Sequence, residues 1–84
     1  AILTGKSLAN IDEIHVHNSH GLIDKSIDEI DFKDYKLLFI GVKREGKFIF
    51  NPQGDFVLEP YDVLLVMGKN ISIKYFKSLH EGKR

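Results

Sequence analysis

The chain has 84 residues, enough for one small domain, and its 43% hydrophobic and 29% charged residues are typical of a folded globular protein rather than a disordered one. Its formal net charge is zero, whereas a nucleic-acid-binding domain normally carries a clear basic excess, so we expect no nucleic acid partner. The apolar runs fall far short of the roughly 20 residues that cross a bilayer, and the absence of cysteine excludes disulfides and thiolate metal sites.

The start of the chain carries residues that are typical of a linker, namely Thr4, Gly5, Lys6, Ser7 and Asn10. The chain begins at Ala1 rather than Met, and we expect it to be a piece of a longer protein. Residues 1–10 are predicted to be a linker remnant from an upstream domain, and residues 11–84 to be the folded domain.

The first predicted elements are a strand and a short helix. Apolar and polar residues alternate over 11–17, which is typical of a strand with one buried face. Ser26 and Glu29 then have the spacing of a capping box, in which each side chain satisfies a free backbone N–H at a helix start. We therefore predict a helix of about two turns over 26–33.

Two apolar runs, 37–42 and 63–67, are predicted to be central strands buried on both faces, because neither offers a polar side to water. Between the first run and residues 47–50 lie only Glu45 and Gly46, which predict a tight hairpin turn.

The end of the chain is predicted to be helical over 71–79. Ile73, Phe76 and Leu79 fall on one side of this helix, and Asn70 is a suitable cap. The order of elements predicts an α+β fold, a small, mostly antiparallel sheet carrying two helices.

Three of the four histidines, His15, His17 and His20, form a cluster that could bind a divalent metal ion, because residues two apart on a strand share a face. The alternatives are that His15 and His17 are the solvated face of a strand, or that they sense pH.

Few other side chains indicate a catalytic or ligand-binding role. Asp62 stands in a turn before a buried strand, and we expect its carboxylate to accept backbone N–H groups there. Lys43, Arg44 and Lys47 flank the hairpin, where charges normally aid solubility, although they could meet a phosphate. No nucleophilic cysteine or glycine-rich phosphate loop is present, so we expect a protein that is not an enzyme.

Apolar residues near turns suggest a protein–protein interface. A single small core cannot easily cover all of them, and twofold pairing is the commonest way to bury an exposed patch. We therefore predict a homodimer with any ligand at or near its interface. The residues in question are Leu22, Ile23, Phe48, Phe50 and Phe56.

The ordered set of motifs resembles the RCK C-terminal domain, also called the TrkA-C domain, over roughly residues 11–79, which is most of the chain. The helix start is DKSIDEI at 24–30, and the apolar strand with its basic hairpin is LFIGVKREG at 38–46. A proline turn follows at 51–52, and LEPYDVLLVMG at 58–68 contains an aspartate followed by a strand that ends in glycine. Two positions depart from the family pattern, because Asp24 and Tyr61 stand where the family usually has glycine.

The resemblance implies a cytoplasmic regulatory, ligand-sensing and dimerising module of a potassium channel or transporter. It also implies an upstream nucleotide-binding RCK domain and a membrane pore in the full-length protein, which places the domain beside an inner-membrane transport protein. Family ligands include divalent metal ions and cyclic di-AMP, a cyclic dinucleotide, so the ligand here is left open. Two alternatives remain: a purely structural pairing domain, or a small histidine-based metal-binding domain.

Overall fold

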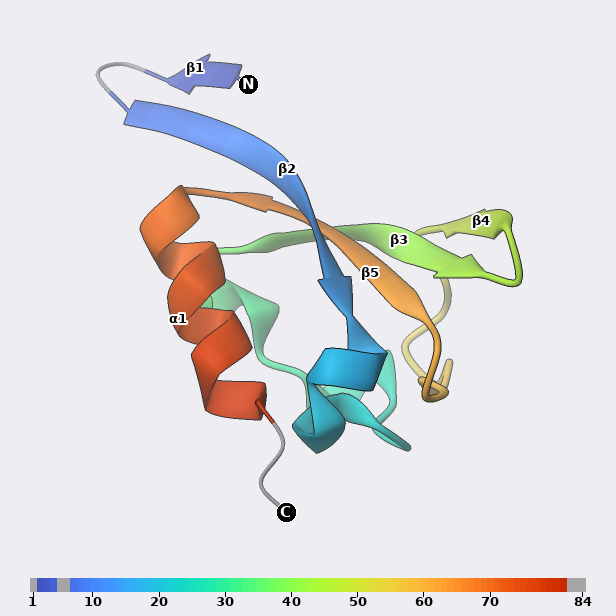
Figure 1. Cartoon of the computed structure of the whole chain (residues 1–84). Helices are drawn as coiled ribbons and strands as arrows, with labels where there is room; N and C mark the ends of the chain where they lie inside the picture. The colour runs from blue at the N-terminus through green and yellow to red at the C-terminus, as the bar shows by residue number, and fades with distance from the viewer. Residues whose placement is uncertain (1, 5–6, 82–84) are drawn as a thin grey trace.

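The computed structural model describes residues 2–4 and 7–81, and shows an antiparallel sheet with one layer of helical segments against it (Figure 1). The strands are β1 (Ile2–Thr4), β2 (Ser7–His15), β3 (Leu38–Arg44), β4 (Lys47–Phe50) and β5 (Val63–Gly68). The helical segments are helix α1 (Asn70–His80) and the 3-10 turns η1 (Val16–Asn18), η2 (His20–Leu22), η3 (Ile27–Glu29) and η4 (Phe32–Tyr35).

The strand order is β1-β2-β5-β3-β4, and every neighbouring pair is antiparallel. β5 is the central strand of the sheet: Leu64 lies opposite Ile14 of β2 on one side and Val42 of β3 on the other. All three side chains are fully buried, so this row forms the middle of the core. The predicted α+β class with a mostly antiparallel sheet is confirmed.

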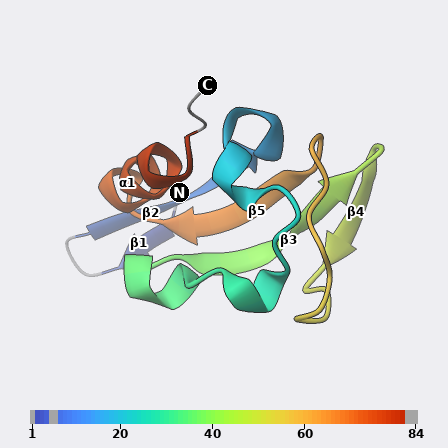
Figure 2. The ribbon, with the colours of Figure 1, turned by 90° about the horizontal axis from the view of Figure 1, so that it is seen from below.

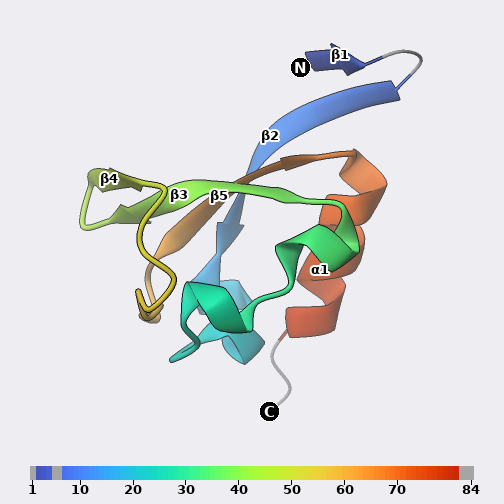
Figure 3. The same cartoon turned by 180° about the vertical axis from the view of Figure 1, so that it is seen from behind.

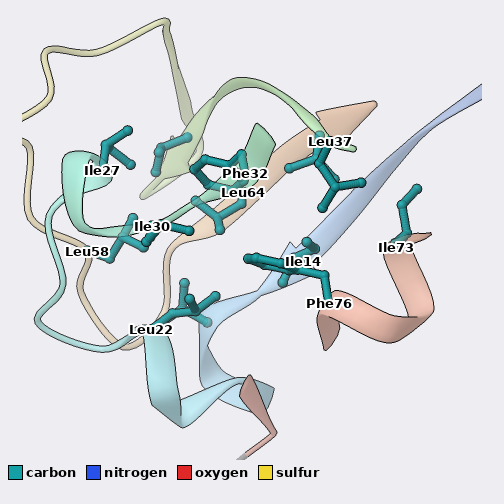
Figure 4. Close-up of a cluster of buried hydrophobic side chains, with 13 residues drawn as sticks. Ile14, Leu22, Ile27, Ile30, Phe32, Leu37, Leu58, Leu64, Ile73 and Phe76 are labelled. Atoms are coloured by element: carbon teal, nitrogen blue, oxygen red, sulfur yellow. The ribbon is translucent and has the colours of Figure 1, made fainter. Parts of the chain in front are cut away.

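The core lies between the sheet and α1. In Figures 1 and 3 α1 and the 3-10 turns lie on the lower side of the sheet, and Figure 2 shows the molecule from below. Figure 4 shows Phe76 of α1 close to Ile14 of β2, and the Phe76 ring also stacks on that of Phe32, with centroids 5.6 Å apart. Burying each such side chain stabilises the fold by about 1.5–3 kcal/mol.

The segment predicted as a helix over 26–33 is instead made of the 3-10 turns η3 and η4, so α1 is the only α-helix among the described residues. The backbone leaves helical geometry at Ile30, whose ψ is 121°. The N–H groups of Ile27 and Asp28 donate to Phe56 and Gly54, which fastens η3 to the loop before β5. The aspartates in this segment are also poor residues for a helix interior.

The prediction that both central strands are buried on both faces is wrong. Along β5, Leu64 and Val66 are buried, whereas Leu65 and Met67 on the other side are only half-buried. The reason is that helical segments cover one side of the sheet only. We call the uncovered side the open face; it carries the outward side chains of Ile11, Leu38, Phe48, Phe50, Leu65 and Met67.

The strand predicted over 11–17 corresponds to β2, which begins earlier, at Ser7, and ends at His15. Val16 was predicted to continue the strand, but it begins η1, and its N–H donates to the carbonyl of Asp62 at 3.0 Å. Residues 1, 5 and 6 of the predicted linker lie outside the described part of the chain, and the assignment of 1–10 to a linker stays a prediction.

The hairpin prediction is confirmed. Glu45 and Gly46 both have positive φ, 51° and 78°, as the tight turn between β3 and β4 requires. Helix α1 also matches its prediction, but Lys69 rather than Asn70 is its N-cap, and Leu79 is 47% exposed instead of facing the core. Among the described residues, no helix has the length and apolar character needed to cross a bilayer.

Candidate functional site

A pocket of about 610 Å³ opens at the end of the sheet where β5 leads into α1. Its volume lies within the usual range for small-molecule sites. Among the described residues that line it, every charged one is a lysine, and most of the rest are apolar. We call it the lysine pocket, and its main lining residues are Lys33, Lys36, Lys69, Leu38, Met67 and Ile71.

Local backbone geometry brings the lysines together. Lys36 is the C-cap residue that follows η4, and it has the left-handed conformation, with φ 62°. This turns the chain so that Leu37 enters the core. Lys69 is extended and precedes α1, whose first turn contains no acid. The positive end of the helix dipole therefore adds to the field of the ammonium groups. The arrangement suits a ligand that combines negative charge with an apolar or aromatic part.

A second polar centre lies at the other end of β3, around Asp62. Its carboxylate is 2% exposed and accepts two hydrogen bonds from Arg44, at 2.8 Å from Nε and 2.6 Å from Nη2. It also accepts the backbone N–H of Glu59 at 2.8 Å. The hydrogen bond to Asp62 raises the pKa of Arg44 above its usual value, so the guanidinium stays charged. This geometry agrees with the turn role predicted for Asp62.

Sequence reasoning missed the role of Arg44, which was grouped with the solubilising hairpin charges. The guanidinium lies 4.5 Å over the ring of Phe56 and donates to the carbonyl of Val57 at 2.9 Å. Arg44 therefore joins the end of β3 to the loop that precedes β5. The available signal was an arginine at a strand end together with an acid just before a buried strand.

The structure separates the predicted histidine cluster. His15 Nε2 lies 3.2 Å from Glu13 Oε1, whereas the ring of His17 stacks on that of Tyr61, with centroids 5.0 Å apart. His20 begins η2. Across residues 2–4 and 7–81, no three His, Asp or Glu side chains are placed to share a metal ion. The other oxygen of Glu13 lies 3.3 Å from Lys43 Nζ, which already supplies a positive charge.

The predicted capping pair holds the start of η3. The backbone N–H of Ser26 donates to the carboxylate of Glu29 at 2.8 Å, and this hydrogen bond holds the pKa of Glu29 below its usual value. Asp24, one of the two departures from the family glycines, has a φ of 67°, so it takes the left-handed conformation that glycine usually provides. Tyr61 keeps a negative φ and stacks on His17.

The apolar residues predicted to be uncovered divide into two groups. Leu22 is fully buried, and Ile23 and Phe56 pack against the core, because the 3-10 turns fold over them. Phe48 and Phe50 are exposed, at 48% and 72%, on the open face.

The antiparallel sheet and its single covering layer define a small α+β domain. The sequence profile of the TrkA-C domain matches residues 11–80. The chain belongs to the TrkA-C domain family, which is the resemblance expected from its sequence.

Solved structures agree with this assignment. The RCK C domain of the potassium transport protein KtrA, in complex with cyclic diadenosine monophosphate (c-di-AMP), has a TM-score of 0.75 and 25% identity, over 84% of this chain and 82% of that chain. An RCK_C domain dimer of S. agalactiae BusR in complex with c-di-AMP has a TM-score of 0.70 and 26% identity, over 81% and 85% of the two chains. BusR has also been solved with its busAB-promotor DNA; there this chain covers 38% of that chain, with a TM-score of 0.71 and 26% identity.

A relative by sequence comes from a potassium channel. Probable potassium channel protein 2 of Methanocaldococcus jannaschii is 36% identical over 45 residues, which is 54% of this chain. The match spans 13% of the length of that relative.

Proposed function

We propose that this domain is the cytoplasmic regulatory module of a potassium channel or transporter, that it pairs with a second copy, and that it senses a cyclic dinucleotide. Family membership supports the regulatory role. The choice of ligand is supported by the complexes of the KtrA and BusR domains with c-di-AMP. The protein acts by binding rather than by catalysis, and its neutral net charge argues against nucleic acid as a partner of this domain.

The lysine pocket is the observation that carries the proposal. A cyclic dinucleotide has two phosphate groups and two flat bases. Lys33, Lys36 and Lys69 can neutralise the phosphates, while Leu38 and Met67 offer apolar surface to a base. A site with this charge favours a nucleotide over a free divalent cation, which the ammonium groups would repel.

Regulation requires the ligand to prefer one arrangement of the paired domains. A ligand shifts a pore only by the difference in its affinity for the two arrangements. In the full-length protein, an upstream nucleotide-binding domain would transmit this preference to the membrane pore. This requires that the module is tethered to a transport protein.

Calorimetric titration with c-di-AMP tests this function. We expect saturable binding by the natural chain, and weakening by about tenfold or more in Lys33→Glu, because a charge that attracted phosphate now repels it. Lys47→Glu is the matched control, since Lys47 lies on the hairpin and not in the pocket lining, and it should bind like the natural chain. No binding, or equal weakening by both variants, would contradict the assignment of the pocket.

A further inference from the structure

A second hollow adjoins the lysine pocket, between η4 and α1. Its volume is about 270 Å³, and Figure 3 shows the two segments that form its walls lying side by side. The two hollows share Lys36, Ile71 and Ser72, so they meet along one edge. We call the second one the tyrosine hollow, because Tyr35 of η4 and Tyr75 of α1 line it.

The tyrosine hollow presents aromatic surface to solvent. Tyr75 is 56% exposed, and its ring lies 5.9 Å from that of Tyr35, tilted by 53°. Tyr35 is held from its other side, because its ring meets the fully buried ring of Phe76 edge-on, at 5.6 Å between centroids. Ile71, which is 76% exposed, adds apolar surface to the same hollow. Apolar surface gathered in this way suits a flat aromatic group.

The charges of the tyrosine hollow differ from those of the lysine pocket. Among the described residues, Lys36 lines both hollows, whereas Asp34 lines the tyrosine hollow alone. A carboxylate beside the rings repels a phosphate group, but its oxygens can accept hydrogen bonds from the amino group of a base. The lysine pocket therefore offers a place for phosphate, and the tyrosine hollow offers a place for a base.

Lys36 stands at the boundary between the two hollows. Its backbone is fixed there by the left-handed conformation and by its N–H, which donates to the carbonyl of Lys33 at 3.0 Å. A cyclic dinucleotide has its parts in a corresponding order, with a central ring of sugars and phosphates and a base on either side. A phosphate beside Lys36 would leave one base for each hollow.

We propose that the tyrosine hollow is a second base site, in which one purine base of a cyclic dinucleotide stacks on the ring of Tyr75. The other base contacts Leu38 and Met67 in the lysine pocket. The inference rests on the proposed function and names residues that favour a cyclic dinucleotide over a smaller anion, because a lone phosphate gains nothing from the rings. Stacking of a base on an aromatic side chain contributes to affinity whichever base is bound.

Calorimetric titration of four chains with c-di-AMP tests the tyrosine hollow. Tyr75→Leu keeps an apolar side chain on α1 but removes the ring, and we expect the dissociation constant to rise by about fivefold or more. Tyr75→Phe keeps the ring and should bind within about twofold of the natural chain. Tyr61→Leu is the matched control, because Tyr61 is 78% exposed, stacks on His17 and lines neither hollow. Circular dichroism checks that each variant is folded.

The aromatic protons of Tyr75 give a direct readout of the contact by NMR. A stacked purine shields the protons of the ring beneath it, so these signals should shift upfield when c-di-AMP saturates the natural chain. The signals of Tyr61 should stay in place. This measurement uses the natural chain and therefore tests the proposal should Tyr75→Leu unfold.

The outcomes separate this inference from the proposed function. If c-di-AMP binds the natural chain more tightly than Lys33→Glu but binds Tyr75→Leu equally well, the lysine pocket stands and the tyrosine hollow is overturned. Equal weakening in Tyr75→Leu and Tyr75→Phe would also overturn stacking, because these variants share only the loss of the hydroxyl group. Equal weakening in Tyr61→Leu would overturn the choice of site. No binding by the natural chain would overturn the proposed function and this inference together.

Discussion

Arg44 donates two hydrogen bonds to the carboxylate of Asp62, at 2.8 and 2.6 Å, and Asp62 is 2% exposed. The pair links the last residue of β3 to the residue that precedes β5. A buried carboxylate costs free energy unless it is paired and hydrogen-bonded, and here Arg44 and the N–H of Glu59 supply its partners. Arg44 therefore adds a buried ion pair to the backbone pairing that joins the end of β3 to the start of β5.

Removing this arginine should destabilise the domain strongly. Arg44→Met leaves the carboxylate of Asp62 buried without its charged partner, and we expect the free energy of unfolding to fall by about 3–5 kcal/mol in urea titrations. Lys43→Met is the control, because the neighbouring Lys43 is partly exposed and makes only a long ion pair to Glu13, at 3.3 Å. Equal stability of the two variants would contradict the role given to Arg44.

Adjacent leucines of β5 should differ in their contribution to stability. Leu64 is fully buried in the core, and Leu64→Ala should cost about 2–5 kcal/mol. Leu65 points to the open face, where folding buries less of its apolar side chain. Leu65→Ala should therefore cost only about 1 kcal/mol in the monomer. Thermal unfolding at low protein concentration measures both, and a larger loss at Leu65 would show that the faces are assigned the wrong way round.

The capping pair of η3 predicts a pH dependence. Because the folded pKa of Glu29 is lowered from 4.5, its contribution to stability is present above that value and is lost as pH falls through the lowered pKa. An NMR titration of the Glu29 carboxyl should show the shift directly. Ser26→Pro removes the N–H that donates to Glu29, and the φ of −83° at Ser26 is close to what proline requires. In this variant the pKa of Glu29 should rise, and an unchanged titration would refute the capping role.

Zinc should give no binding heat with the natural chain at about pH 7.5, above the usual imidazole pKa of roughly 6.5. The reason is that His15 pairs with Glu13 while His17 stacks on Tyr61, so the two imidazoles are engaged separately. Heat that weakens as pH falls and disappears in His15→Ala would instead support the histidine-based metal site.

Much of the fold could be predicted from the sequence, because apolar runs and turn residues close together in the chain determine the strands and the hairpin. Apolar runs located β3 and β5, and Glu45-Gly46 located the hairpin turn. The segment after Ser26 was predicted incorrectly because its backbone N–H groups bond to the distant loop at Gly54 and Phe56, a tertiary contact that no local spacing reveals. Burial of both faces of the central strands was also predicted incorrectly, because an apolar run does not require that a helix of the same chain covers its outward side.

The candidate site was harder to predict than the fold. The lysine pocket joins Lys33 and Lys36 to Lys69, which lies more than thirty positions along the chain, so no motif contains it. Spacing suggested the histidines because they are close in sequence, but η1 begins directly after His15 and turns His17 toward Tyr61. Proximity in sequence therefore suggested side chains that the fold separates, and the pocket consists of residues that the sequence keeps apart.

The central claim is that ligand binding and pairing are coupled in one domain, and sedimentation equilibrium with and without c-di-AMP tests it most directly. Because a regulatory ligand must prefer one arrangement of the paired domains, we predict that saturating c-di-AMP changes the dimer dissociation constant of the natural chain by about fivefold or more. The effect should be absent in Lys33→Glu and retained in Lys47→Glu. A dissociation constant that is the same with and without bound c-di-AMP would contradict the account.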